Sequence, residues 1–211
     1  ISSSVLQIGQ SAFRECSRLS VITIPEGVEV IDGWAFEYCY DLFEVNLPNS
    51  LMDLGTGAFQ GCSSLTKIEI PKGITVLKKD VFQSCRSLNE VVIPENITEI
   101  GENTFFECRG MTKVKFSSTL KKIGDAAFAN CTSLSEAKIP YGVTQIDRSA
   151  FNNCALTEAE IPDSVVTMGE YVFANCKYLT KIKLSASMER IPNGLVNSCA
   201  IEEFVVPKWI T

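Results

Sequence analysis

Nine cysteines stand at almost equal intervals along this chain of 211 residues. Successive cysteines are 23 residues apart, except that 22 residues separate Cys154 from Cys176. The full series is Cys16, Cys39, Cys62, Cys85, Cys108, Cys131, Cys154, Cys176 and Cys199. A fixed period of roughly 20 to 50 residues is typical of repeat architectures, in which each copy forms one structural unit. The spacing therefore predicts a single solenoid over residues 1–211.

The same register aligns the other residues into the motif L-x-x-I-x-I-P-x-x-V-x-x-I-G-x-x-A-F-x-x-C-x-x. Its first part, as in Leu65 to Pro71, alternates apolar and polar residues and ends at a proline. Because proline cannot donate to a ladder, this part predicts a short strand. One copy cannot bury its own apolar face, so the copies must stack and each strand must pair in parallel with the next.

The second half of the motif is expected to be helical. In the copy from Gly124 to Cys131, the residues Ala127, Phe128 and Cys131 would share one helix face. Between strand and helix, apolar residues such as Val143 and Ile146 indicate a second short extended segment.

With these motifs aligned, the whole chain resembles the leucine-rich repeat superfamily, specifically its BspA-like subclass. The resemblance implies a right-handed α/β solenoid of about nine 23-residue units, with one parallel β-sheet on one face and short helices opposite. BspA-like proteins are typically surface or secreted proteins of bacteria and some protists, and they are often implicated in attachment to host proteins. The resemblance therefore also implies a cell-surface or secreted location. Both ends of the chain fall inside a repeat, and we expect it to be a fragment of a longer protein.

The cysteines could form disulfides, bind metal, act as a nucleophile or fill the core. An odd number cannot pair completely, and neighbouring copies would place their Cβ atoms further apart than the ~3.8 Å of a disulfide. No short C-x₂₋₄-C spacing suggests a metal site, and the chain has no histidine to serve as a base. We therefore expect buried, inert thiols, no catalytic residue, no metal and no cofactor.

Charge and hydropathy exclude further classes of partner. The net charge of −6 disfavours nucleic acid, because phosphate binding needs a basic face. No apolar run approaches the ~20 residues of a membrane-spanning helix, so no membrane insertion is expected.

The outward positions of the strand provide the first set of candidate partner-binding residues. Glutamate and lysine alternate across neighbouring copies there, which favours cross-strand ion pairs. A solvated charge ladder and a binding surface both fit this pattern. The candidates are Glu44, Lys67, Glu69, Lys113, Lys115, Glu136 and Lys138.

Aromatic residues outside the recurring core columns provide the second set. Four of them, Trp34, Tyr38, Tyr40 and Phe43, fall within ten residues of the second copy. They could be contact hot spots for a partner or could pack against an adjacent segment of a longer chain.

These observations predict a non-catalytic binding or adhesion module that presents an extended surface to a protein, possibly a host extracellular protein, or to a glycan. Two alternatives remain: a structural spacer within a larger surface protein, and a carbohydrate-directed accessory to an enzyme.

Overall fold

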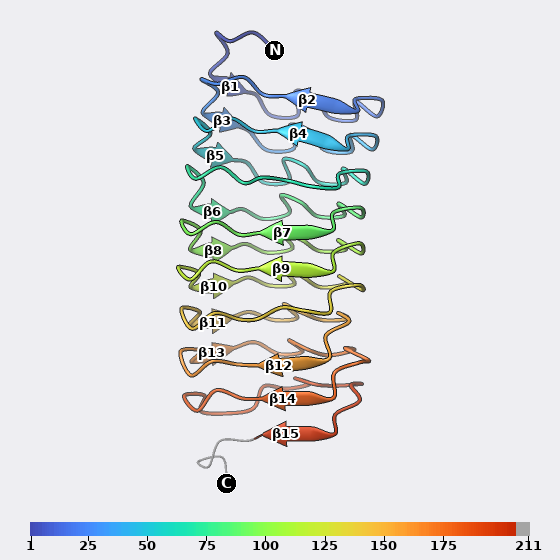
Figure 1. Ribbon diagram of the computed structural model, residues 1–211, viewed down its shortest axis with the longest axis vertical. Helices are drawn as coiled ribbons and strands as arrows, with labels where there is room; N and C mark the ends of the chain where they lie inside the picture. The colour runs from blue at the N-terminus through green and yellow to red at the C-terminus, as the bar shows by residue number, and fades with distance from the viewer. Residues whose placement is uncertain (206–211) are drawn as a thin grey trace.

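The computed structural model describes residues 1–205 of the chain, which form a stack of flattened coils along one long axis (Figure 1). Partners in neighbouring coils are 23 residues apart, as in Gln7 and Val30, or 22 where a copy is one residue shorter, as in Gln145 and Thr167. The predicted parallel β-solenoid of about nine 23-residue turns is thereby confirmed.

Each coil contributes to two columns of strands, and all the strand pairs are parallel. The longer strands form the first column: β2 (Val21–Thr23), β4 (Glu44–Asn46), β7 (Glu90–Val92), β9 (Lys113–Lys115), β12 (Glu158–Glu160), β14 (Lys181–Lys183) and β15 (Glu203–Val205). The second column holds two-residue strands: β1 (Gln7–Ile8), β3 (Val30–Ile31), β5 (Asp53–Leu54), β6 (Val76–Leu77), β8 (Glu99–Ile100), β10 (Lys122–Ile123), β11 (Gln145–Ile146) and β13 (Thr167–Met168). The second column confirms the predicted second extended segment.

The first column is not the single continuous sheet that the resemblance implies. It is divided into β2–β4, β7–β9 and β12–β14–β15. At 67–70 and at 137–139 the chain keeps its place in the stack but forms no strand ladder with either neighbouring coil. A single bridge, Lys113 to Glu136, lies next to the second of these segments.

The predicted short helices are wrong: residues 1–205 contain no helix. The segment in question, 32–39 and its equivalents, is a succession of turns with two residues per coil in the left-handed region, such as Trp34 (φ 56°) and Tyr38 (φ 59°). Glu37 donates its N–H to Trp34 O within the coil, whereas Phe36 donates to Ala58 O in the next coil. A helix would keep all of these bonds inside the segment. Here every second N–H group bonds to the next coil instead. A helix as short as this segment would also be only marginally stable by itself.

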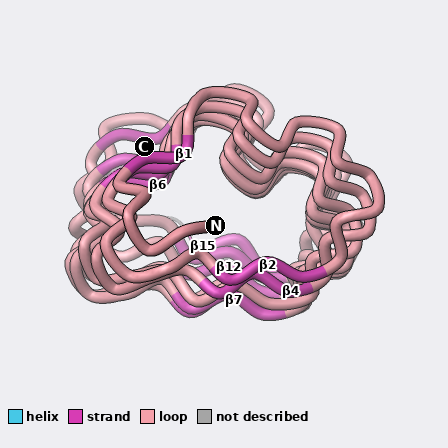
Figure 2. Tube along the Cα trace, turned by 90° about the horizontal axis from the view of Figure 1, so that it is seen from above, coloured by secondary structure: helices cyan, strands magenta, loops and turns pink. Residues whose placement is uncertain are grey.

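We call this region of each coil the turn segment. In the view along the solenoid axis (Figure 2), it lies in the strand-free connection that leads from the second strand column to the first.

Two residue columns dominate the interior. The phenylalanines of the turn segment form a continuous stack from Phe13 to Phe173, with neighbouring ring centroids 5.0 to 5.9 Å apart. The cysteine column runs beside it. Each Sγ–H from Cys39 onward donates to the carbonyl of the phenylalanine in the preceding coil, as in Cys108 to Phe82 O at 3.1 Å.

The prediction of buried thiols is confirmed for seven cysteines, from Cys39 to Cys176. Cys199 is half-buried, and Cys16, in the first coil, is exposed. Burial raises the pKa of the Cys39 thiol to about 11 and that of Cys176 to about 12. These two thiols therefore stay protonated at neutral pH.

Candidate binding surfaces

The outward side of the first strand column, which we call the strand face, carries the charged candidates. The register places Glu90 beside Lys113 and Lys113 beside Glu136 on adjacent coils. Glu44, Lys67, Glu69, Lys115, Glu136 and Lys138 are exposed, and Lys113 is half-buried. The structure therefore brings all seven candidates to one face, although their role in binding stays a prediction.

Part of the expected charge ladder is present as ion pairs. Three pairs cross from coil to coil, and a fourth joins Lys67 to Glu69 within one coil at 2.5 Å. The cross-coil pairs are Lys113–Glu136 (2.6 Å), Lys183–Glu160 (2.7 Å) and Lys181–Glu203 (2.9 Å). Within residues 1–205, Glu90, Lys115, Lys138 and Glu158 have no ion-pair partner.

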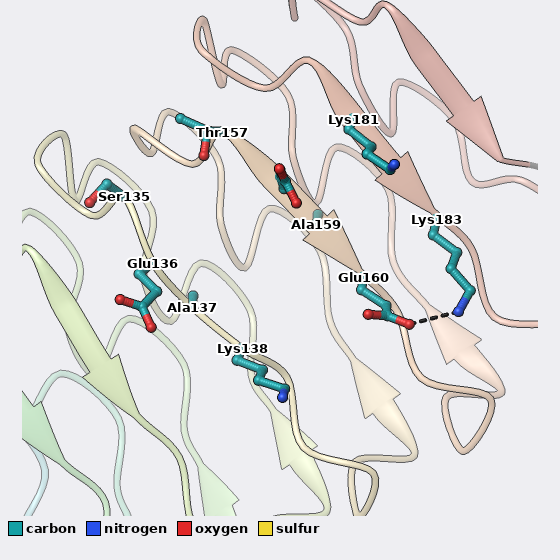
Figure 3. Close-up of a pocket in the computed structure, with 10 residues that line it drawn as sticks. Ser135, Glu136, Ala137, Lys138, Thr157, Ala159, Glu160, Lys181 and Lys183 are labelled. Atoms are coloured by element: carbon teal, nitrogen blue, oxygen red, sulfur yellow. Dashed lines mark hydrogen bonds and ion pairs between the residues drawn. The ribbon is translucent and has the colours of Figure 1, made fainter.

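Shallow hollows flank the two places where the ladder is interrupted. One, of about 390 Å³, lies between 135–138 and β12, with Lys181 and Lys183 at its border. Its floor includes Ala137 and Ala159, in a column where neighbouring coils have Val114 and Ile182. Figure 3 shows charged side chains around it, with Glu160 held by Lys183. These hollows are open and have walls of both charges.

Trp34 and Tyr38 belong to a turn segment and not to a helix. Their rings point along the solenoid axis, and each ring packs against a glycine of the next coil. A Cβ atom on Gly57 would be 2.7 Å from Trp34 Cδ1, and a Cβ atom on Gly61 would be 2.4 Å from a Tyr38 ring carbon. Each ring therefore packs against the backbone of a glycine, and the side chain of any other residue at that position would collide with the ring.

Tyr40 extends this surface. Its ring stacks on that of Tyr38 with centroids 5.7 Å apart, and it is 48% exposed, while Trp34 is 36% exposed. We call Trp34, Tyr38 and Tyr40 the aromatic ledge. Phe43 belongs elsewhere: it is exposed beside β4 and lines a hollow with Lys67 and Glu69.

One charged pair joins the turn segment of the ledge to that of the first coil. Glu37, between Trp34 and Tyr38 in sequence, is only 6% exposed, and Arg14 Nε lies 2.7 Å from its Oε2. Burial raises the pKa of Glu37, and the Arg14 guanidinium opposes that shift. The pair ties the first coil to the second beneath the ledge.

Sequence reasoning missed the glycines and one further aromatic. Tyr171 lies over Gly194 with the same geometry: a Cβ there would be 2.3 Å from the tyrosine ring. The sequence signal is an aromatic residue at a turn-segment position followed by glycine at the same position of the next copy, as in Trp34 and Gly57.

The described residues contain neither a candidate metal-ligand group nor a candidate membrane-spanning helix. Residues 1–205 contain no group of three or more histidine, cysteine, aspartate or glutamate side chains arranged to hold a metal ion. The same part of the chain has no helix with the length and hydropathy needed to span a bilayer.

Comparisons with known proteins agree with the repeat pattern. The family model for the BspA type leucine-rich repeat region matches residues 1–112 and 98–211. No curated protein sequence matches the chain.

Three solved structures are similar to it. A leucine rich cell surface protein from Faecalibacterium prausnitzii has 25% identity and a TM-score of 0.58, over 96% of this chain and 71% of that one. A leucine rich repeat protein from T. pallidum has 28% identity and a TM-score of 0.67, over 83% and 72%. A leucine-rich repeat protein from Bacteroides ovatus, at 22% identity and a TM-score of 0.57 over 98% and 82%, supports the fold alone.

Proposed function

The chain belongs to the BspA-type leucine-rich repeat family, and we propose that it is a non-catalytic adhesion module that binds a protein partner at the cell surface. The comparisons indicate no enzyme family. A similar solved structure is described as a cell surface protein, which supports the proposed location.

The observation that carries the proposal is the aromatic ledge. Large rings are enriched among the few residues that dominate binding energy at protein interfaces. On this chain Trp34 and Tyr38 are already fixed against Gly57 and Gly61, so binding would cost little additional side-chain entropy. Tyr40, stacked on Tyr38, supplies a further exposed ring with a hydroxyl group. A rigid solenoid presents these rings without rearrangement.

The test is binding of purified extracellular host proteins to the immobilised chain and to two ledge variants, Trp34→Ala and Tyr40→Ala. Each substitution should weaken binding by tenfold or more, which corresponds to about 1.4 kcal/mol or more. Tyr141→Ala is the matched control, because Tyr141 is 75% exposed and lies outside the ledge. Equal losses for Tyr40→Ala and Tyr141→Ala would exclude the ledge as the contact.

A panel with no bound protein would contradict the proposal and would favour a spacer role. A glycan array in which binding depends on Trp34 would replace the protein partner with a glycan.

A further inference from the structure

The charges of the strand face have an order that matters for self-association. From the coil of β4 to the coil of β9, the first outward position alternates in sign: Glu44, Lys67, Glu90, Lys113. The next residue in this column, Glu136, continues the alternation. If a second copy presents this column in the reverse direction and shifted by one coil, each glutamate of one copy faces a lysine of the other wherever the two columns overlap.

A second copy can face the first in two ways that a two-fold axis allows. If the axis runs along the solenoid, each strand faces the same strand of the second copy in the opposite direction. The first outward position of one strand then lies opposite the second outward position of the other. Lys113 would then face Lys115, and the same holds for β12, with two glutamates, and for β14, with two lysines. Like charges in direct opposition disfavour this arrangement.

If the axis runs parallel to the strands, midway between β7 and β9, the solenoids are antiparallel. Strand β7 then faces β9 of the second copy, segment 67–69 faces segment 136–138, and β4 faces β12. The opposed pairs are Glu90 with Lys113, Lys67 with Glu136, and Glu69 with Lys138. One like-charge pair remains, Glu44 with Glu158.

These contacts would link the ion pairs that already exist within each copy. Lys67 holds Glu69 in one copy, and Lys113 holds Glu136 in the other. The three contacts between copies join them into a chain of six charges that alternate in sign and end at Glu90 and Lys138. Those two end residues have no ion-pair partner within the described part of a single copy.

We infer that the strand face binds a second copy of this chain, with the two solenoids antiparallel and the two-fold axis between β7 and β9. Eight coils would overlap, spanning about 40 Å at ~4.8 Å per coil. With a width of roughly 17 Å from five strand residues, the face approaches the ~800 Å² per partner of a standard interface. The turn segments and the aromatic ledge lie outside the strand face, so this inference does not depend on the proposed function.

The experiment measures mass by sedimentation equilibrium on the full chain of 23.2 kDa, with the thiols kept reduced. The natural chain should form a dimer. Lys138→Glu and Glu69→Lys should each weaken it about a hundredfold, because both symmetry-related contacts become repulsive. A mixture of the two variants should restore a heterodimer. One of its two contacts is then the natural pair, and the other joins the two substituted positions, whose charges are opposite but exchanged.

The controls carry the same charge changes elsewhere. Lys177→Glu and Glu29→Lys alter exposed residues outside the strand face and should leave the dimer unchanged. Thermal unfolding by circular dichroism checks that every variant is folded. A monomer at about 100 µM would overturn the inference. A dimer that survives both reversals, or variants that stay monomeric when mixed, would overturn it equally.

Discussion

At the scale of single residues, the ring of Trp34 fills the space that a side chain at position 57 of the next coil would need. Gly57 has a φ of 62°, and the left-handed region costs an alanine roughly 1 kcal/mol. Ala126 adopts a φ of 49° at the equivalent position, so the backbone accepts a Cβ atom there. The strict demand for glycine at position 57 therefore comes from the ring of Trp34.

A double-mutant cycle tests this coupling. Gly57→Ala should cost about 2 to 4 kcal/mol of unfolding free energy in the natural chain, because the new Cβ atom overlaps the indole ring. In a Trp34→Ala background the same change should cost only about 1 kcal/mol, the backbone part alone. Urea denaturation measures all four corners of the cycle. Equal costs in both backgrounds would show that the ring does not select the glycine.

The sequence predicts some of these residues and not others. It separated Trp34 and Tyr38 from the core columns, because most residues at the equivalent positions of other copies are polar or glycine. It did not show what they contact, since that depends on the left-handed backbone that directs the rings along the axis. The next coil covers each ring only in part, and Trp34 remains 36% exposed.

At the scale of elements, the strands and the core were predictable because alternation and period directly reflect which side chains face inward. The helix prediction failed because a pattern of buried positions does not say where the main-chain N–H groups bond. Phe36 donates to the next coil, and no side-chain pattern encodes that choice. The interruptions of the ladder were equally hidden, since Ile68 and Ala137 keep the alternation intact.

The phenylalanine stack makes a prediction at this scale. Phe105 is fully buried between two rings, at 5.5 and 5.2 Å. Phe105→Ala should therefore cost about 3 to 5 kcal/mol of unfolding free energy by leaving a cavity. Phe13 is half-buried with one ring neighbour in the stack, so Phe13→Ala should cost less than about 2 kcal/mol. Urea denaturation compares the two, and similar costs would contradict the view that the stack is stabilised from both sides.

At the scale of the whole molecule, repetition multiplies a small local effect. A coil buries little by itself, and stability comes from stacking, so a perturbation that recurs in every coil acts on the entire solenoid. The buried cysteines are such a recurring feature: seven of them lie in successive coils, from Cys39 to Cys176.

This column predicts a steep loss of stability in alkali. In the unfolded chain thiols titrate near pH 8.5, whereas burial raises the folded pKa of Cys39 to about 11 and of Cys176 to about 12. Above pH 8.5 the unfolded chain therefore holds fewer protons than the folded one, and unfolding free energy falls as pH rises, by up to about 1.4 kcal/mol per pH unit for each buried thiol. Below pH 8.5 the full contribution is present; above it the contribution is progressively lost, up to about pH 11 for Cys39 and about pH 12 for Cys176.

Two alanine variants isolate the thiols from lysine and tyrosine, which titrate in the same range. Cys108→Ala removes a buried thiol and should reduce the slope of unfolding free energy against pH by about 1.4 kcal/mol per unit between pH 9 and pH 10. Cys16→Ala, which removes the exposed cysteine of the same series, is the matched control. Urea denaturation at each pH, under reducing conditions, measures both. If the slopes of Cys108→Ala and the natural chain coincide, the thiol column does not control alkaline unfolding, and the solenoid must open by another titration.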